Sequence, residues 1–241
     1  MAQDGVILET KGLTMRFGGV VAVNNVDFSM KEGELRCLIG PNGAGKSTFF
    51  KCLTRQYRPS AGHVFFRSTD ITGDITFQIA RRGIGIKTQV PSVFDGLSVH
   101  ENIWLSARRH HKTREANRIT DEIIQRIGLG HATRRLVGQL AHGERQWVEL
   151  GIVLTGEPSL ILLDEPTAGM TGEEVGRTTE LIREINRQAA LIVVEHDMQF
   201  IKAIAQRVTV FHQGAILVED TMANILSNQQ VRDIYLGKHT V

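Results

Sequence analysis

Short runs of aliphatic and β-branched residues recur along the chain, and glycine, proline or charged residues bound each run. Runs of this kind are typical of buried strands. The predicted strands are Val6–Leu8, Leu35–Ile39, Val64–Phe66, Ile84–Thr88, Leu160–Asp164, Leu191–Glu195, Val208–Phe211 and Ile216–Val218. The helices predicted around them are Lys46–Leu53, Glu173–Arg187 and Asp197–Ala205, with a C-terminal helical tail over Asn224–Leu236.

The alternation of strands and helices stops between about Val90 and Gly156, where no convincing strand is found. Three helices are predicted there instead, over Val99–Arg109, Arg114–Ile127 and Glu144–Leu154. In the second of them four isoleucines share one helical face, which indicates burial of that face. The sequence therefore predicts a single domain over residues 1–241: an α/β core formed by 1–88 and 157–241, interrupted by a helical subdomain over 90–156.

Composition excludes several classes of protein. Of the 241 residues 41% are hydrophobic and 22% charged, which is typical of a globular domain. The net charge of +2 does not require a polyanionic partner. The apolar runs are far shorter than a membrane span, the first residues lack the apolar core of a signal peptide, and two cysteines give no disulfide framework. A membrane channel, a secreted miniprotein and a disordered tail are thus excluded.

Glycine is over-represented at 24 residues, and its placement is informative. A glycine-rich segment between the first long apolar run and a predicted helix satisfies G-x-x-x-x-G-K-[S/T]. Glycines let backbone N–H groups surround phosphate oxygens, and the following helix adds the positive end of its dipole. Lys46 would reach the β- and γ-phosphates, and the Ser47 hydroxyl would bind Mg²⁺. The candidate phosphate-binding residues are Gly40, Pro41, Asn42, Gly43, Ala44, Gly45, Lys46, Ser47 and Thr48.

Two acids, Asp164 and Glu165, close the apolar strand predicted at Leu160–Asp164. In P-loop enzymes a strand-end aspartate holds Mg²⁺, and Asp164 fits this role. Glu165 could accept a proton from the attacking water or orient it. An isolated Asp-Glu pair is more often a solvated strand end, but its combination with a phosphate loop favours the metal and catalytic roles.

With these motifs the chain resembles the ATPases of ATP-binding cassette (ABC) transporters over nearly its whole length. Phe17, in LTMRFGG, lies where the family stacks an aromatic ring on adenine. Gln89, which ends IGIKTQ, matches the glutamine that senses Mg²⁺ and the γ-phosphate. His196, in VVEHD, matches the switch histidine that contacts the γ-phosphate. The segment LAHGERQ matches the family signature, usually written LSGGQ, and contributes Ala141, His142, Gly143 and Glu144.

The resemblance implies an α/β fold with a P-loop NTPase (RecA-like) core, an antiparallel β subdomain and an inserted α-helical subdomain. It implies ATP and Mg²⁺ as ligands. The implied catalytic residues are Glu165, His196, Gln89 and Lys46, and the implied metal site contains Ser47, Gln89 and Asp164. Two subunits would enclose two ATP molecules head to tail, with the phosphate loop of one facing the signature of the other. A helix beginning at Gly143 would then present its N-terminus to the neighbour's nucleotide, and Gln89 with Val90–Leu97 would carry movement to a membrane partner.

Two positions depart from the family pattern. Ala141 replaces the usual serine of the signature, so a hydroxyl contact to the γ-phosphate is missing and weaker closure of the dimer is expected. Thr171 lies where the family often has an aspartate, so a carboxylate implied in coupling across the dimer is missing. The phosphate loop and Glu165 are intact, so a hydrolytically active subunit is still predicted.

Finer features are similar to the ATPases of importers for branched-chain amino acids and for urea or short-chain amides. Among them are His142-Gly143-Glu144 in the signature, Ala168-Gly169-Met170-Thr171, and the terminal Tyr235-Leu236-Gly237. The implied partners are a second ATPase subunit, identical or different, two transmembrane permeases and, indirectly, a periplasmic or extracellular substrate-binding protein. No nucleic acid is expected, and the implied location is the cytoplasmic face of the inner membrane.

Three alternative functions fit the sequence less well. A soluble ABC ATPase acting on nucleic acid or ribosomes usually carries two cassettes or a long coiled-coil insert, and neither is seen in this sequence. A small-molecule kinase also has a phosphate loop but has no need of LAHGERQ or the switch histidine. A binding-only regulatory module would require Glu165 to be dispensable.

Overall fold

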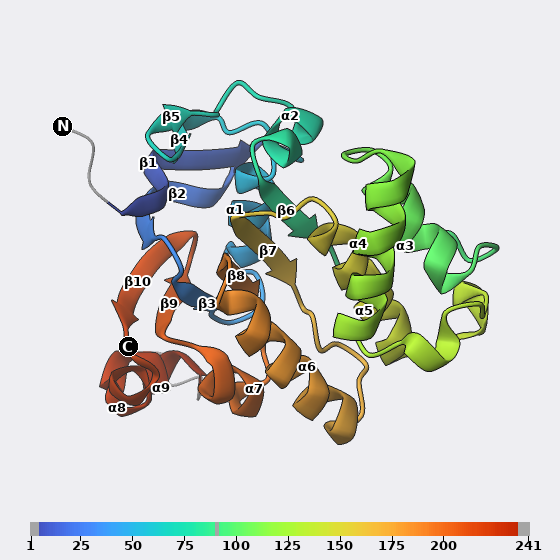
Figure 1. The fold of residues 1–241 in the computed structure, drawn as a ribbon. Coiled ribbons are helices and arrows are strands. Elements are labelled where there is room, and N and C mark those ends of the chain that lie inside the picture. The colour runs from blue at the N-terminus through green and yellow to red at the C-terminus, as the bar shows by residue number, and fades with distance from the viewer. Residues whose placement is uncertain (1–4, 90–91, 236–241) are drawn as a thin grey trace.

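The computed structural model describes residues 5–89 and 92–235, and contains two sheets and an inserted group of helices (Figure 1). The larger sheet has six strands in the order β10-β9-β3-β8-β7-β6. Its strands are β3 (Leu35–Ile39), β6 (Ile84–Lys87), β7 (Leu160–Asp164), β8 (Ala190–Val194), β9 (Arg207–His212) and β10 (Ala215–Asp220). All neighbours pair in parallel except β10, which is antiparallel to β9. This arrangement is the predicted α/β core.

The central strands β3, β7 and β8 are buried along their whole length, which explains why they read as continuous apolar runs. Because successive side chains point to opposite faces, each strand contributes to two cores. Ile161 and Leu163 of β7 pack with the helices on one face, and Leu160 and Leu162 pack toward the second sheet on the other. The sheet is therefore covered on both faces.

The second sheet is antiparallel, in the order β2-β1-β4-β5. It contains β1 (Val6–Phe17), β2 (Val20–Lys31), β4 (Ala61–Phe66) and β5 (Thr69–Asp70). The sequence pattern predicted only Val6–Leu8 of the long hairpin and missed β2. From Asn25 onward that strand alternates exposed polar with buried apolar residues, and its apolar start, Val20–Val23, is only four residues long and mostly unburied.

Helices α3 (Val99–Ala107), α4 (Thr113–Arg126) and α5 (His142–Leu154) form the inserted group, with short 3₁₀ turns at Gly130–Ala132 and Val137–Gln139. Helix α5 begins at His142, with Ala141 as its N-cap, and not at the predicted Glu144 or Gly143. The earlier start follows from Glu144, whose carboxylate accepts the backbone N–H of Ala141 and fixes the first turn. Val90, part of the segment expected to carry movement to a partner, lies outside the described residues.

The remaining helices connect the strands of the core. They are α1 (Lys46–Leu53), α2 (Thr76–Arg81), α6 (Gly172–Asn186), α7 (Met198–Ile204), α8 (Met222–Ser227) and α9 (Gln229–Tyr235). Helix α2 was missed because a single turn and a half with one buried residue, Ile79, shows no periodicity. Helices α8 and α9 confirm the predicted C-terminal helical tail.

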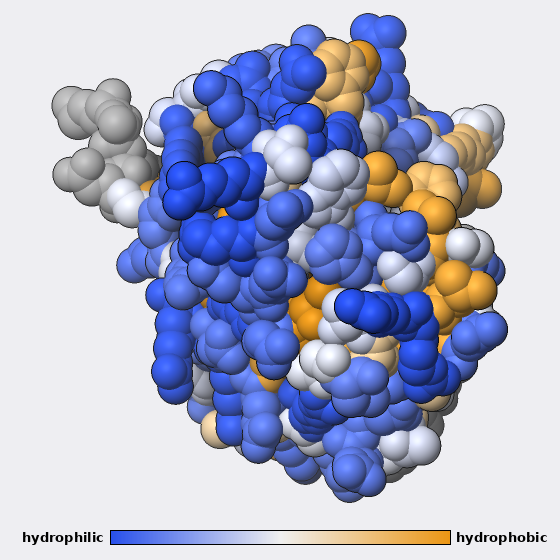
Figure 2. Space-filling model, turned by 45° about the vertical axis from the view of Figure 1, so that its right-hand side comes forward, coloured by the Kyte–Doolittle hydropathy of each residue, from blue (hydrophilic) through white to orange (hydrophobic). Residues whose placement is uncertain are grey.

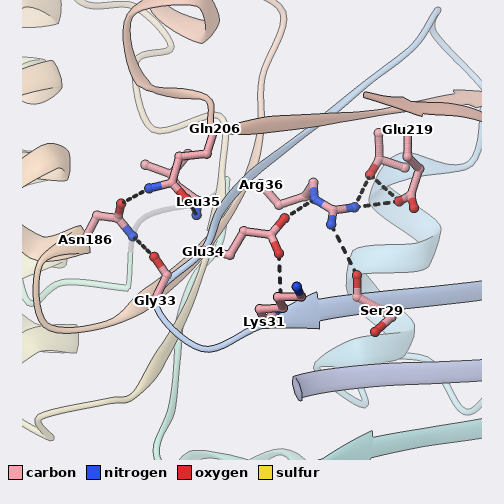
Figure 3. A network of polar contacts seen from close by, with 10 residues as sticks. Ser29, Lys31, Gly33, Glu34, Leu35, Arg36, Asn186, Gln206 and Glu219 are labelled. Atoms are coloured by element: carbon pink, nitrogen blue, oxygen red, sulfur yellow. Dashed lines mark hydrogen bonds and ion pairs between the residues drawn. The ribbon is translucent and has the colours of Figure 1, made fainter. Parts of the chain in front are cut away.

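A buried cluster around Arg36 fastens the two sheets to each other (Figure 3). The Arg36 side chain is only 1% exposed, and it donates to Glu34 at 2.6 Å, to Glu219 at 2.6 Å and to the Ser29 carbonyl of β2 at 3.2 Å. Thr209 completes the cluster by accepting from Arg36 at 2.9 Å and donating to Glu219 at 2.7 Å. We call these five residues the sheet joint.

On the face shown in Figure 2, hydrophobic residues form separate patches among hydrophilic ones. Within residues 5–89 and 92–235, no helix is both long enough and apolar enough to cross a membrane.

Candidate functional site

The glycine-rich loop connects β3 to α1 and follows the course predicted for a phosphate loop. Its glycines allow close packing against neighbouring strands as well as access of a ligand to the backbone N–H groups. A Cβ on Gly40 would lie 2.3 Å from the Phe211 carbonyl oxygen, and one on Gly45 would lie 2.5 Å from that of Ala22. Gly43, at φ 78°, has open space around it instead. The loop is thus pressed against β9 and β2 on one side and faces open space at Gly43.

Lys46 is buried at the start of α1 and turns back over the loop. Its ammonium group donates to the carbonyl oxygens of Gly40 at 2.6 Å and Pro41 at 3.0 Å. Burial lowers the pKa of this lysine, and the nearby carboxylates of Glu165 and Asp164 oppose the shift. The side chain is therefore held within the loop, close to two acids.

Asp164 and Glu165 differ in their surroundings although they are neighbours. Asp164 ends β7 and is 6% exposed, and burial followed by the charge of Glu165 raises its pKa. Glu165 adopts a left-handed backbone conformation at φ 48°, while its N–H donates to the Val194 carbonyl at 2.9 Å. Such a conformation is uncommon for a residue with a side chain and is often found at functional sites. It turns Glu165 out of the strand direction.

Glu165 meets two other predicted residues there. The Gln89 amide donates to Glu165 Oε2 at 2.8 Å, and His196 Nε2 lies 3.3 Å from Glu165 Oε1. A pocket of about 200 Å³ opens between Glu165, His196 and the loop. Its lining consists of Ala22, Asn42, Gly43, Ala44, Gly45, Lys46, Ser47, Thr48, Glu165 and His196. The structure thus brings the phosphate loop, Glu165, His196 and Gln89 together from four separate segments.

Glu195 is a residue of this site that the sequence analysis did not single out. It is 5% exposed, and its carboxylate accepts the backbone N–H groups of His196 at 2.6 Å and of Thr167 at 3.1 Å. It also accepts from the Thr167 hydroxyl. Glu195 therefore ties the loop after β8 to the loop after β7. Its position just before His196 in a strand-end sequence was the only available signal.

The signature segment lies at the start of α5. Ala141 has no side-chain acceptor, so only the Glu144 half of a capping box is present, with the Ala141 N–H donating at 3.0 Å. His142 Nε2 lies 3.0 Å from the Ala168 carbonyl oxygen, which links the signature to the loop after β7. A Cβ on Gly143 would lie 2.3 Å from the Glu174 carboxylate. None of these signature residues lines the phosphate-loop pocket of its own chain.

Thr171, the residue in place of the family's aspartate, is the N-cap of α6. Its hydroxyl accepts the Glu174 N–H at 3.3 Å, and the Glu174 carboxylate accepts the Thr171 N–H at 2.8 Å. Threonine and aspartate are both good N-caps, so the local structure does not need the carboxylate.

Phe17 ends β1 with 43% of its surface exposed, and its ring meets the Tyr57 ring edge-on at 5.2 Å between centroids. Phe17 does not line the pocket beside the phosphate loop.

The donor set for a metal is small. Among the described residues no three His, Cys, Asp or Glu side chains gather in a cluster that could hold an ion. Asp164 and Ser47 supply one carboxylate and one hydroxyl. Mg²⁺ is commonly bound by one or two protein oxygens together with phosphate oxygens and waters, so this sparse set fits Mg²⁺ in the presence of a nucleotide.

Comparison with known proteins identifies the family. The profile of the ABC transporter family matches residues 23–168, which is more than half of the chain. The chain belongs to the ABC transporter family. It is an ATPase of that family, with ATP hydrolysis coupled to transport. The family assignment and the ABC ATPase fold, both expected from the motifs, are confirmed.

Individual relatives cover nearly all of this chain. It is 34% identical to the high-affinity branched-chain amino acid transport ATP-binding protein LivG of Salmonella typhimurium, over 96% of this chain and 98% of the relative. It is 33% identical to BraF of Pseudomonas aeruginosa, which has the same description, over the same shares. Among solved structures, the ADP conformation of the ABC transporter cassette MJ1267 has a TM-score of 0.86 at 25% identity, covering 96% of this chain and 99% of that one.

Proposed function

We propose that this ATPase is the energy-supplying subunit of an importer for branched-chain amino acids. The observation that supports it most is the 34% identity to LivG over 96% of the chain. Urea or short-chain amides are the second candidate, supported by the segments GELRCLIG and AGMTGEE, which are similar to that branch. We propose that residues 1–241 act as one domain in which the helical part, 90–156, moves against the core.

We infer that Glu165 is the general base of ATP hydrolysis. Its two carboxylate oxygens face Gln89 and His196, and its backbone turns it toward the pocket that the phosphate loop lines. A carboxylate held in this way can accept the proton of an attacking water. Lys46, His196 and the loop N–H groups of 40–48 would bind the phosphates, with Phe17 against the base. Glu195 would hold the backbone of His196 in place.

Asp164 and Ser47, with Gln89 beside them, would hold Mg²⁺. The ion would supply positive charge that neutralises the β- and γ-phosphate oxygens. The burial that raises the pKa of Asp164 also favours a nearby cation, because a charged carboxylate in this place needs a partner.

We propose that a second ATPase subunit completes each site. None of the signature residues lines the pocket of its own chain. These residues, Ala141, His142, Gly143 and Glu144, form the N-terminus of α5. A helix N-terminus attracts phosphate through its dipole, so contact with the neighbour's nucleotide needs no hydroxyl. Ala141→Ser would add a hydroxyl contact to that of the helix N-terminus, so it should raise the fraction of dimer formed with ATP, measured by light scattering in the Glu165→Gln background. An unchanged or lowered fraction would contradict this role.

The permease partner is proposed to dock in a groove of about 520 Å³ between the core and the helical group. Residues of α2, β6, α3 and α5 line the groove, and Arg81 and Arg109 give it a basic rim. Phe77 adds an aromatic side chain that is 46% exposed. This chemistry fits a short amphipathic helix of the permease with an acidic end, which would place the subunit at the cytoplasmic face of the inner membrane.

Docking is tested by co-purification of the chain with its membrane permeases. Arg81→Glu combined with Arg109→Glu should remove most of the co-purified permease, because both changes place repulsive charge at the rim. Arg118→Glu, on the exposed face of α4 away from the groove, is the matched control and should retain it. Equal retention by both variants would place the permease elsewhere.

The catalytic assignment is tested by Glu165→Gln. Loss of a general base should lower kcat by at least about 100-fold while the affinity for ATP is retained. Glu180→Gln, an exposed glutamate on α6, is the control and should hydrolyse ATP at the normal rate. Normal turnover in Glu165→Gln would exclude this residue as the base.

The substrate is tested in vesicles that contain the complete transporter, by ATP-dependent uptake of labelled leucine and labelled urea. Uptake of urea alone would favour the second candidate.

A further inference from the structure

A buried pair of opposite charges connects the core to the helical group beside the catalytic pocket. Lys87 ends β6, is 1% exposed, and lies opposite Leu163 in the pairing of β6 with β7. Glu149 lies in the middle of α5 and is 3% exposed. The Lys87 ammonium and Glu149 Oε2 are 3.4 Å apart. The pair therefore joins a strand next to the catalytic acids to the helix that carries the signature.

Glu149 also forms a hydrogen bond with a second segment of the chain, at Ser92. Its Oε1 accepts the backbone N–H of Ser92 at 3.1 Å. Lys87 precedes Gln89 by two residues and Ser92 follows it by three, so one carboxylate contacts both sides of the segment that carries Gln89. We call Lys87, Glu149 and Ser92 the helical joint.

The contacts of Gln89 connect this joint to the chemistry. The Gln89 amide donates to Glu165 at 2.8 Å, and this is the hydrogen bond that places the amide against the proposed base. Glu149 in addition lines the groove proposed for the permease. One carboxylate on α5 is thus in contact with the groove on one side and with both flanks of the Gln89 segment on the other.

We propose that Glu149, through Lys87 and the Ser92 N–H, is a positioning residue that fixes Gln89 against Glu165. This inference rests on the proposed role of Glu165 in hydrolysis. Glu149 does not line the phosphate-loop pocket, so it acts on the rate of hydrolysis through Gln89 and not on nucleotide binding. When α5 moves relative to the core, the same contacts move the Gln89 segment with it.

Two double variants test the proposal without leaving a buried charge unpaired. Lys87→Met with Glu149→Met removes the ion pair and the acceptor for Ser92. Lys87→Met with Glu149→Gln removes the charges but keeps an acceptor oxygen. We expect the first to lower kcat for ATP at least about tenfold with KM changed less than about twofold, because a displaced catalytic group slows reaction without weakening binding. The second should recover a kcat within about threefold of the original.

The matched control is Glu34→Gln in the sheet joint, which removes another buried carboxylate that faces an arginine. Its kcat should stay within about twofold of the original below its melting temperature. The proposal is overturned if the Met–Met variant is folded and fully active, if its KM rises in proportion to the loss of rate, or if Glu34→Gln loses as much activity. Glu165→Gln separates the two claims: normal turnover there overturns the assigned base and this inference with it, whereas an inactive Glu165→Gln beside a fully active Met–Met variant overturns only the inference.

Discussion

The sheet joint and the helical joint are both buried clusters of charge, yet they satisfy their polar atoms differently. Arg36 of the sheet joint has acceptors for Nε, Nη1 and Nη2, and a threonine hydroxyl bridges it to Glu219. In the helical joint the Lys87 ammonium and Glu149 Oε2 have no well-directed hydrogen bond although they face each other. Burial lowers the pKa of Lys87 and raises that of Glu149.

The difference separates a fixed connection from a movable one. A buried charge stabilises only when geometry and hydrogen bonds compensate for lost hydration. The sheet joint meets this condition, so it holds the two sheets in one arrangement. The helical joint meets it incompletely, so its ion pair contributes little to the free energy of folding. A weakly stabilising connection of this kind would suit the proposed movement of the helical group against the core.

The largest expected effect is at the sheet joint. Arg36→Met would leave Glu34 and Glu219 without their cation, and removing one partner of a buried pair costs about 3–5 kcal/mol. The measurement is urea unfolding followed by circular dichroism. A loss below about 1 kcal/mol would show that this joint is no better satisfied than the other.

The opposite sign is expected at the helical joint. Replacing Lys87 and Glu149 together by methionine should leave the free energy of unfolding unchanged or raise it by up to about 4 kcal/mol, since apolar side chains of similar size carry no desolvation cost. Thermal and urea unfolding of the double variant check this. A clear loss of stability would mean that the ion pair stabilises the fold and would remove the contrast between the joints.

The helical joint should also respond to pH. Burial raises the pKa of Glu149 above the ordinary range of a glutamate, and Lys87 opposes this. The folded state therefore holds the proton more tightly than the unfolded chain, and the stability it adds is full below the ordinary pKa and lost as the pH rises through the folded-state pKa. Lowering the pH from about 7.5 to about 5 should therefore stabilise the unmodified chain relative to Glu149→Gln. The quantity measured is the difference between their free energies of unfolding. A difference independent of pH in urea titrations would contradict the raised pKa.

The smallest effect is expected at the rim of the sheet joint. Glu219 is 26% exposed at its side chain, and Arg36 keeps Glu34 when Glu219 is changed. Glu219→Gln should therefore cost about 1 kcal/mol or less, because partial hydration screens the pair. Differential scanning calorimetry checks this value. A loss as large as that of Arg36→Met would show that Glu219 alone compensates the arginine.

The sequence predicted best where one local feature decides structure. In the loop 40–48, Gly40 and Gly45 lie where a Cβ atom would be blocked, and the strands β3, β7 and β8 are apolar because both faces are buried. It failed where burial is one-sided or the element is short, as in β2 and α2. The start of α5 was misplaced because Ala141 gives no capping signal in the sequence.

Arg55 occupies a backbone position at which glycine is usually favoured. It follows the C-cap of α1 at φ 58°, a left-handed position in which glycine is the favoured residue. Its Nε donates to the Thr72 carbonyl at 3.0 Å. The hydrogen bond offsets part of the backbone strain, and no sequence pattern reveals it.

The sequence by itself determined the family, and it predicted the phosphate loop and the site residues Asp164, Glu165, Gln89 and His196, because each belongs to a motif whose spacing is local. Only the tertiary structure decided that Glu165 lies between Gln89 and His196, and that Glu195, Lys87 and Glu149 hold the surrounding loops. Apart from the contact of Glu195 with its neighbour His196, these contacts join residues 28 to 76 positions apart, so they depend on strand order and on helix packing. Neither strand order nor helix packing can be predicted from a local pattern of residues.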